Sequence, residues 1–427
     1  MMERYREYKE SGVKWLGEIP SHWEVFRNKD IFHECKKAVG KNSNNYTLLS
    51  LSKKGVVIRN MDDGGKFPAE FDTYKVVEPG DFIFCFFDVD ETPRAVGLSS
   101  EYGMITGAYT VLRQSIANSQ YLYYYYLSID DAKALKPLYT GLRKTVPLNA
   151  FMSMQIFLPP LSEQDAIVRY LYSATSEIDK AIAMQQKMID LLNERKQIII
   201  QNAVTKGLDE NVEMKESGVE WIGRIPKHWE VSKLKYIIKK PLKYGANEAS
   251  EYIDYSCPRY IRITDIDSNG KLKEDTFRSL PRDKAEPYLL SKGDILFARS
   301  GATVGKAFLF EEEYKACYAG YLIKASFDNK KVLSKFVYLY TQTLAYQRWK
   351  ESIFIQATIQ NISGEKYSNM QIAIPPISEQ KKLIDWLLPR LNVFDSAITN
   401  CQRQITLLQE RKQIIINEVV TGKVRVI

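Results

Sequence analysis

The chain contains one stretch of sequence twice, and the two copies agree at their edges while they differ in their middles. Residues 9–25 read KESGVKWLGEIPSHWEV, and residues 215–231 read KESGVEWIGRIPKHWEV. Two later stretches are also shared, LPPLSEQ at 158–164 with IPPISEQ at 374–380, and LLNERKQIII at 191–200 with LLQERKQIII at 407–416. Because a repeat of this kind decides the architecture, the sequence predicts one frame, present twice, that carries two different inserts.

The distance between the copies shows which part has changed in length. It is 206 residues at the first shared stretch and 216 residues at both later ones. The difference of ten residues therefore falls within the inserts, 26–157 and 232–373. The part after each Pro-Pro pair has the same length in both copies, as expected if this part sets a distance.

The segments after the Pro-Pro pairs have the pattern of long helices. Apolar residues recur there at steps of three and four, which predicts one apolar stripe on each helix and packing of the two helices on each other. Ser162 and Ser378 are predicted as N-cap residues, and Gly207 and Gly422 as the residues that close the helices.

One proline interrupts this pattern in the second copy. Pro389 has no backbone N–H and disfavours helix in the residue before it. The sequence therefore predicts a short helix near 378–388, a break, and a long helix from about 391.

Each insert mixes short β-rich runs with turn residues, which predicts a compact α+β domain. The expected strands are 46–51, 81–86, 109–113, 259–263, 294–298 and 320–325, and the expected helices are 119–129 and 334–349. A Gly-Asp pair precedes an apolar run in both inserts, at Gly80-Asp81 and Gly293-Asp294, which indicates a shared fold. The tyrosine-rich run 121–126 is interpreted as a core or interface helix, with a stacking platform for bases as the alternative.

The predicted fold class is thus α+β. It consists of two globular mixed α/β domains separated by two long antiparallel coiled-coil helices, in a pseudo-twofold circular repeat. The expected boundaries are a first domain with its repeat segment, the first long helix, a second domain with its repeat segment, and the second long helix, at 1–160, 161–207, 208–376 and 377–427.

Charge is distributed unevenly along the chain. The insert 26–157 has 16 basic and 14 acidic residues, whereas 232–373 has 23 basic and 16 acidic residues. Their net charges of +2 and +7 compare with +8 for the whole chain, so the basic excess lies in the inserts. Such an excess fits a polyanionic partner, although solvated lysines explain it equally well.

Several classes of protein are disfavoured. No apolar run approaches the ~20 residues that cross a bilayer, and the first ten residues lack the apolar stretch of a secretory signal. The five cysteines are odd in number and form no CxxC pair, a pattern typical of reduced thiols. We therefore expect a cytoplasmic location and no membrane partner.

No motif predicts an active site. His22 and His228 lie in the repeated Ile-Pro-x-His-Trp segments, without a nucleophile or paired carboxylate at a recognisable spacing, so these segments are interpreted as docking structure. The stretch 301–306 resembles a phosphate loop only superficially, because Ala307 stands where that loop needs Ser or Thr. We expect the chain to bind neither a metal nor a cofactor.

The inserts do offer side chains suited to DNA. Arg forms two hydrogen bonds with guanine and Gln with adenine, while Lys, Ser and Thr contact phosphates. The small, basic and hydroxyl residues after the strand at 294–298 fit this chemistry, with an ordinary turn as the alternative. The candidate DNA-contacting residues are Lys53, Lys54, Arg59, Arg94, Arg143, Lys144, Arg259, Arg262, Arg299, Ser300, Thr303, Lys306, Gln356, Thr358 and Gln360.

Taken together, the motifs resemble those of one family. The repeated SGV-W-G-IP-HWEV segment, the PP-SEQ turn, the helices that end in ERKQIII and then VTK or VTG, and the stretch GDILFARSGATVGK resemble the specificity subunits of type I restriction–modification systems. The resemblance covers essentially the whole chain, and the doubled order of the motifs is specific. In that family each insert is a target recognition domain, and the frames form two antiparallel helices between them.

The resemblance implies a non-catalytic subunit with several partners. These are double-stranded DNA, two methyltransferase subunits and, through them, restriction and translocase subunits. The methyltransferase brings S-adenosylmethionine and flips the target adenine out of the duplex. Two alternatives remain at this point, namely a coiled-coil DNA-binding adaptor and a standalone DNA methyltransferase or nuclease.

Overall fold

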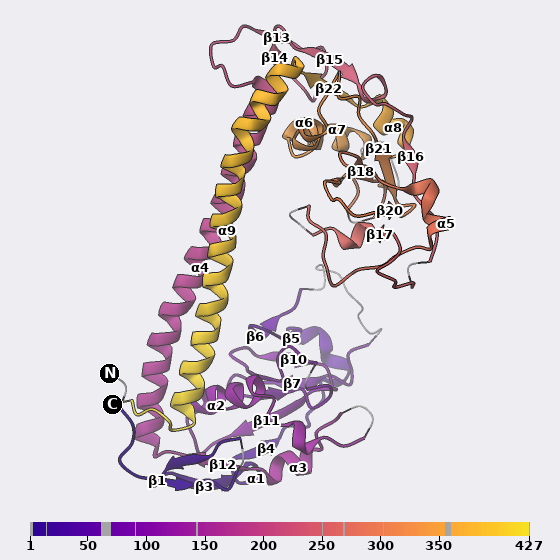
Figure 1. Ribbon diagram of the computed structural model, residues 1–427. Coiled ribbons are helices and arrows are strands. Elements are labelled where there is room, and N and C mark those ends of the chain that lie inside the picture. The colour runs from indigo at the N-terminus through magenta and orange to yellow at the C-terminus, as the bar shows by residue number, and fades with distance from the viewer. Residues whose placement is uncertain are drawn as a thin grey trace. The chain divides into compact units, whose positions relative to one another are not determined.

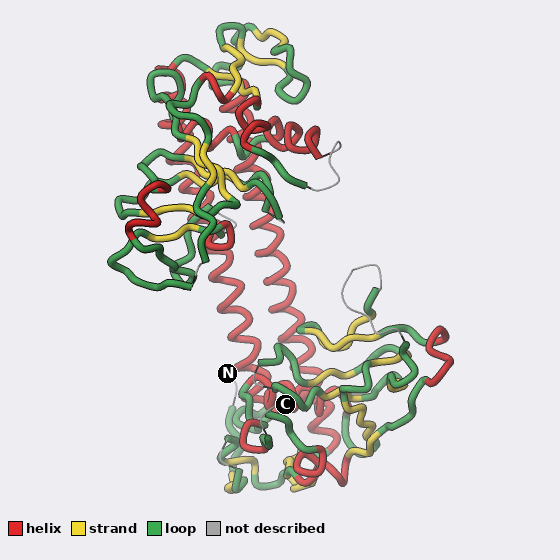
Figure 2. The backbone as a smooth tube through the Cα atoms, turned by 90° about the vertical axis from the view of Figure 1, so that its right-hand side faces the viewer, coloured by secondary structure: helices red, strands yellow, loops and turns green. Residues whose placement is uncertain are grey.

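Two compact units make up the structure. The computed structural model describes residues 3–13, 15–60, 70–89, 91–141, 144–249, 251–267, 270–301, 303–354 and 360–426. Unit 1 comprises Met1–Gln186 and Gln402–Ile427, and unit 2 comprises Lys187–Cys401. Each unit therefore contains one insert and about half of each long helix (Figure 1). Figure 2 shows that the strands lie together with the loops in the globular part of each unit and not along the two long helices.

The two long helices are α4 (Leu161–Lys206) and α9 (Ile377–Val420). The carbonyl oxygen of Pro160 accepts hydrogen bonds from the backbone N–H groups of Glu163 and Gln164, at 2.9 and 3.0 Å. Helix α4 therefore begins directly after the prolines, and α9 does the same. The predicted N-caps Ser162 and Ser378 are wrong, because both serines lie inside the first turn.

The predicted break at Pro389 is also wrong, since α9 runs through this residue. Proline removes one helical hydrogen bond from a helix interior. The residues around it bury a full apolar face, with Leu383 and Leu387 at 0% exposure and Leu391 at 7%. Packing over several turns outweighs the loss of one hydrogen bond, so helix α9 continues. The predicted glycine ends are confirmed: Gly207 and Gly422 follow the helices with positive φ angles of 81° and 73°.

In each unit, one half of α4 packs against one half of α9. In unit 1 Ile167 and Leu171, near the start of α4, share a core with Val419 near the end of α9. Further along, Asp179 pairs with Lys412 at 2.7 Å, so the two halves run antiparallel. Unit 2 has the pair Lys196–Asp395 at 2.5 Å. All four charged residues are related by the 216-residue repeat, so both units use the same helix pairing.

Each insert starts and ends on a two-stranded antiparallel sheet of the frame. In unit 1, β3 (Glu24–Arg27) pairs with β12 (Gln155–Leu158), which leads into α4. In unit 2, β15 (Glu230–Lys233) pairs with β22 (Gln371–Ile374), which leads into α9. Antiparallel hairpins precede these strands, formed by β1 (Tyr8–Glu10) with β2 (Glu18–Pro20) and by β13 (Met214–Glu216) with β14 (Arg224–Pro226).

The inserts share a four-stranded antiparallel sheet. Its order is β4-β11-β8-β9 in unit 1 and β16-β21-β18-β19 in unit 2. The third strand of each follows a Gly-Asp pair, and Gly80 and Gly293 both have a φ of 92°. Asp81 and Asp294 are buried beside them. This correspondence confirms the predicted kinship of the inserts. The strand bounds are β4 (Phe32–Glu34), β11 (Thr110–Gln114), β8 (Phe82–Phe84), β9 (Val96–Leu98), β16 (Lys243–Tyr244), β21 (Leu322–Ala325), β18 (Ile295–Ala298) and β19 (Ala307–Leu309).

Helices join these sheets to the frame. Helix α2 (Ser119–Asp131) confirms the helix expected at 119–129, and Tyr121, Tyr125 and Tyr126 are at most 1% exposed, which confirms the core interpretation. The stretch 334–349 is not one helix but two, α6 (Ser334–Tyr340) and α7 (Leu344–Phe354). The hydroxyl of Thr343 donates to the Tyr340 carbonyl oxygen at 2.7 Å and stabilises the turn between them.

Shorter elements complete both inserts. In unit 1 they are α1 (Asn28–Ile31), β5 (Leu49–Ser52), β6 (Gly55–Ile58), β7 (Lys75–Val77), β10 (Gly103–Ile105) and α3 (Leu148–Ser153). In unit 2 they are β17 (Arg259–Ile261), α5 (Arg282–Ala285), β20 (Ala316–Tyr318) and α8 (Gly364–Asn369). The mixture of helix and strand confirms the α+β class. Among the described residues, no helix is both long enough and apolar enough to span a membrane.

Candidate nucleic-acid interface and its attachment to the frame

The loop after β18 brings several candidate DNA-contacting residues of unit 2 together. Arg299 and Ser300 leave the strand, and Ser300 forms an isolated antiparallel bridge with Asn361, next to the exposed candidate Gln360. Thr303 and the exposed Lys306 follow in the same loop. Because residues 299–306 and 360–361 are adjacent only in the fold, this bridge places side chains from two distant segments on one edge.

Arg299 is held in place from several sides. Its guanidinium lies over the ring of Tyr244, with 5.0 Å from Cζ to the ring centroid. Its backbone N–H donates to the carbonyl oxygen of Tyr321 at 3.0 Å, and its own carbonyl oxygen accepts from the N–H of Ile362 at 2.8 Å. Tyr321 is itself 63% exposed. The Nε of Arg299 is buried and has no hydrogen-bond partner among the described residues.

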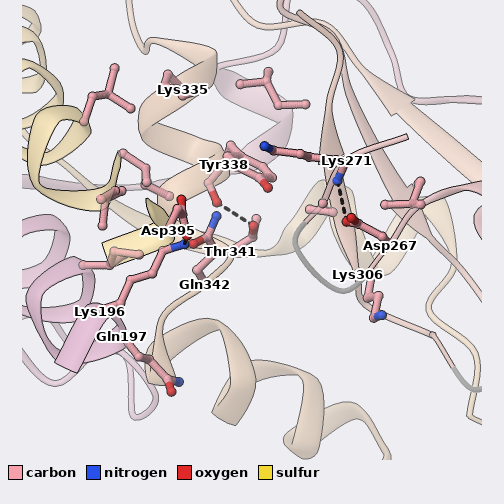
Figure 3. A pocket seen from close by; sticks show the side chains of 18 of the residues that line it. Lys196, Gln197, Asp267, Lys271, Lys306, Lys335, Tyr338, Thr341, Gln342 and Asp395 are labelled. Atoms are coloured by element: carbon pink, nitrogen blue, oxygen red, sulfur yellow. Dashed lines mark hydrogen bonds and ion pairs between the residues drawn. The ribbon is translucent and has the colours of Figure 1, made fainter. Parts of the chain in front are cut away.

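A basic groove lies beside this loop in unit 2 (Figure 3). This groove is a cavity of about 570 Å³ lined by residues of α4, α6, α7, α9 and two turns. Five of the lining residues are lysines. These are Lys196, Lys271, Lys306, Lys335 and Lys350, against the acidic residues Asp267, Glu311 and Asp395. Lys306 therefore belongs both to the loop after β18 and to the groove.

Only part of this positive charge is neutralised. Lys196 pairs with Asp395 and Lys335 pairs with Glu311. Lys271, Lys306 and Lys350 have no ion pair within the part of the chain that the structure describes. Burial lowers the pKa of Lys350, and a bound phosphate would favour its charged form. The groove is therefore suited to an anion.

The candidates of unit 1 lie at exposed positions of the insert. Lys53 and Lys54 form the turn between β5 and β6, and Arg59 follows β6. All three are exposed. Lys144 is exposed too, has a φ of 45°, and lies 3.3 Å from a carboxylate oxygen of Glu91.

Three candidate arginines make internal contacts. Arg94 pairs with Asp130 and Asp131 at 3.2 and 2.8 Å. Arg262 pairs with Asp265 at 2.6 Å. Arg259 is 8% exposed and donates from Nη2 to the Lys273 carbonyl oxygen. These side chains join segments within one insert and offer less to a ligand than Arg299. The candidates Arg143, Gln356 and Thr358 lie outside the described residues.

The predicted docking role of the Ile-Pro-x-His-Trp segments is confirmed in both units. The acidic residue of the SEQ motif receives the indole N–H of the tryptophan, at 3.2 Å from Trp23 to Glu163 and 3.1 Å from Trp229 to Glu379. The preceding histidine contacts the other carboxylate oxygen at 2.7 Å in both copies. In unit 1 the hydroxyl of Tyr5 also donates a hydrogen bond to Glu163 at 2.6 Å. Burial is the main cause that raises the pKa of Tyr5, and this hydrogen bond is the second.

The next residue of the same motif holds the insert, which the sequence analysis did not foresee. The amide oxygen of Gln164 accepts from the backbone N–H of Asn118, and its nitrogen donates to the Pro159 carbonyl oxygen, both at 2.8 Å. In unit 2, Gln380 accepts from the N–H of Leu333 and donates to the Pro375 carbonyl oxygen, again both at 2.8 Å. Both glutamines are nearly fully buried. Their repetition in the SEQ motif was the one available sign of this role.

A second amide side chain of the frame contacts the same insert helix region. In unit 2, Gln201 of α4 accepts from the backbone N–H of Leu344 at 2.7 Å. In unit 1, Asn417 of α9 accepts from the hydroxyl of Ser128 at 2.7 Å. Positions 201 and 417 are again related by the 216-residue repeat, so the frame contacts each insert through equivalent residues.

No group of His, Cys, Asp and Glu residues in the described part of the chain has an arrangement that could hold a metal ion. The candidate side chains of the loop after β18, Arg299, Ser300, Thr303 and Lys306, can donate hydrogen bonds, and two of them carry positive charge. Their chemistry suits the recognition of phosphates and base edges.

Known proteins are similar to this chain in sequence. The family model described as "Type I restriction modification DNA specificity domain" matches residues 226–409. The specificity subunit of the type I restriction enzyme MjaVIII from Methanocaldococcus jannaschii is 27% identical, in an alignment covering 65% of this chain and 63% of that protein. A protein of the same organism assigned as the MjaX specificity subunit is 25% identical over 98% of both chains.

A solved structure agrees in fold. It comes from work on complex assembly and conformational transition of the type I R-M system, and it superposes with a TM-score of 0.63 over 94% of this chain and 98% of the other, at 14% identity. The doubled frame and the two different inserts agree with these similarities. The chain is similar to type I restriction enzyme specificity subunits, and its residues 226–409 match the DNA specificity domain of that family.

Proposed function

We propose that this chain reads a DNA sequence in two halves, one with each insert, and that the long helices set the spacing between them. One observation carries the proposal: two different inserts are attached to two equivalent frames by the same residues. The spacing from the Pro-Pro pair to the ERKQIII stretch is the same in both copies, whereas the inserts differ in length, as a function that requires a fixed separation predicts. Half-site spacing is set in the same way by the separation of reading elements in dimeric DNA-binding proteins.

Charge and side-chain chemistry support DNA as the ligand. The second insert has a net charge of +7, and its loop after β18 adjoins the basic groove. Arg299 is suited to a base edge or a phosphate, and the lysines of the groove are suited to the DNA backbone. Lys53, Lys54 and Arg59 are the corresponding candidates of the first insert.

Exposed apolar residues on the helices support a protein partner. Leu191 and Ile198 on α4 are each 50% exposed, and their repeat equivalents Leu407 and Ile414 on α9 are 47% and 54% exposed. Positions seven residues apart lie on the same face of a helix. Each unit therefore presents one such apolar pair, and two copies of one partner can bind them equivalently.

We infer that these partners are two methyltransferase subunits, which recruit restriction and translocase subunits in turn. The chain itself performs no catalysis and acts in the cytoplasm. The methyltransferase supplies S-adenosylmethionine and modifies the adenine, while this chain chooses the DNA sequence.

Exchange of one insert tests the reading function. Replacing residues 26–157 by an insert from a related chain should change one half of the methylated sequence and leave the other half unchanged. Methylated adenines mapped across a genome give the answer directly. A change in both halves, or methylation by the purified chain without partners, would refute the proposal.

Single substitutions test the partner surfaces. Leu191→Glu should remove one of two methyltransferase subunits from the complex, and Leu407→Glu should remove the other, as measured by native mass spectrometry. The double variant should bind neither. A complex that keeps both subunits in the double variant would exclude these residues from the partner surface.

A further inference from the structure

The frame holds each insert at two points through amide side chains. In unit 2 the points are Gln380 of α9, bonded to Leu333 just before α6, and Gln201 of α4, bonded to Leu344 at the start of α7. In unit 1 they are Gln164 of α4, bonded to Asn118 just before α2, and Asn417 of α9, bonded to Ser128 near the end of α2. Each insert is thus bonded to both long helices. Unit 1 has two further bonds of this kind, from Asn118 to Asp165 of α4 and from the Tyr121 hydroxyl to the Val420 carbonyl oxygen of α9. Figure 1 shows α2 next to the last part of α9.

Two attachment points restrict the rotation of a domain more than one attachment point does. A domain held at one point can pivot about it, whereas bonds at two points fix the direction of the line between them. The points lie at opposite ends of α2 in unit 1 and on either side of α6 in unit 2. Together with the apolar core that each insert shares with the long helices, these four amide side chains therefore restrict the angle of the helix on the frame.

Three of the four contacts are hydrogen bonds to the backbone of the insert. Gln164, Gln380 and Gln201 accept from the N–H groups of Asn118, Leu333 and Leu344. Every residue except proline provides such an N–H. A frame that binds backbone N–H groups accepts inserts of unrelated sequence, as the differing residues Asn118 and Leu333 illustrate.

We propose that Gln164 and Asn417 in unit 1, and Gln380 and Gln201 in unit 2, are positioning residues that orient the two reading domains on the helices and so determine which half-site spacing is accepted. The inference rests on the proposed function, because spacing is meaningful only for a chain that reads both halves. None of the four residues needs to touch DNA. Their loss should therefore loosen the spacing preference without changing the bases preferred in either half.

The test uses the full chain assembled with methyltransferase subunits of its own system. A library of duplexes contains both half-sites at spacers that vary by single base pairs, and methylation of each duplex is measured. Wild-type protein should strongly prefer one spacer. Gln201→Met combined with Gln380→Met removes the hydrogen bonds to Leu344, Leu333 and the Lys331 carbonyl oxygen. It should lower the preference for that spacer over its neighbours at least about fivefold, as expected from the loss of several modest hydrogen bonds.

Matched variants separate positioning from general damage. Gln201→Glu keeps the acceptor for the N–H of Leu344 and should retain spacer discrimination within about twofold of wild type, whereas Gln201→Met should not. Amide hydrogen exchange at Leu333 and Leu344, measured without DNA, should accelerate in the Met variants alone. The base preference of both half-sites should stay as in wild type.

The possible outcomes distinguish the two proposals. If wild type selects no spacer, the proposed function fails and the positioning role falls with it. If wild type selects one spacer and the double Met variant keeps the same discrimination while hydrogen exchange shows that the bonds are lost, only the positioning role is overturned. A changed base preference with unchanged spacing would overturn it as well.

Discussion

The acidic residue of the SEQ motif allows a quantitative comparison between the two copies. Glu379 accepts the indole N–H of Trp229, whose side chain is fully buried, and Glu163 does the same for Trp23. Removing the acceptor leaves a buried donor without a partner, which costs about 1–3 kcal/mol. The contact with the half-exposed histidine adds at most about 1 kcal/mol. We expect Glu379→Ala to destabilise unit 2 by about 2 kcal/mol.

The same change in the first copy should cost more. Glu163 accepts a further hydrogen bond from Tyr5 at 2.6 Å, and a hydrogen bond to a charged group contributes about 1.5–3 kcal/mol. Glu163→Ala should therefore destabilise unit 1 by at least about 1 kcal/mol more than Glu379→Ala destabilises unit 2. Denaturant unfolding gives the free energies, and peptide-resolved hydrogen exchange assigns each loss to its unit.

Two controls make the comparison strict. Glu163→Gln retains an acceptor for both donors and should cost clearly less than Glu163→Ala. Glu177→Ala, at an exposed position on α4, should change stability by less than about 0.5 kcal/mol. The reasoning would be refuted if the Gln and Ala variants were equally unstable, or if Glu163→Ala behaved like the exposed control.

Three further predictions concern single residues. Arg299→Ala should weaken DNA binding by about 1–3 kcal/mol, whereas Arg348→Ala at an exposed position on α7 should not; equal affinities in a titration at fixed salt would remove Arg299 from the interface. Because α9 continues through Pro389, Pro389→Ala should stabilise the chain by about 1–3 kcal/mol, seen as a higher Tm, and a lower Tm would show that the proline is needed. Burial raises the pKa of Cys317 to about 12, so its thiol stays protonated at pH 8. Cys317 should therefore be alkylated at least tenfold more slowly than the half-buried Cys401 in a mass-spectrometric time course. Equal rates would contradict this burial.

The sequence could predict what depends on periodicity and repetition. The long helices, their glycine ends and the kinship of the inserts all leave regular patterns, and the structure confirms them. The break at Pro389 was wrong because a local preference yields to an apolar face buried over several turns. The break between α6 and α7 at Thr343 was missed. A local hydrogen bond from Thr343 to Tyr340 stabilises this turn, and Leu344 also donates to Gln201, which is more than 140 residues away.

The candidate site shows a similar division. Loop residues such as Arg299 and Lys306 could be proposed from composition and loop position. The partner of Arg94 could not, because Asp130 lies 36 residues away and meets it only in the folded insert. The Arg262–Asp265 pair has a spacing of three residues, so its internal role was readable from the sequence alone.

The frame sheets explain why the inserts can change length without disturbing the helices. Glu24 pairs with Leu158 in unit 1, and Glu230 pairs with Ile374 in unit 2. The second insert is ten residues longer, yet each of these pairings joins repeat-equivalent residues in the same register. Both ends of an insert connect to neighbouring paired strands. Added residues therefore enlarge the domain without changing the positions of the frame strands. Variation in the inserts and constancy in the helices therefore follow from one structural arrangement: a sheet that closes the insert at its base before the helix begins.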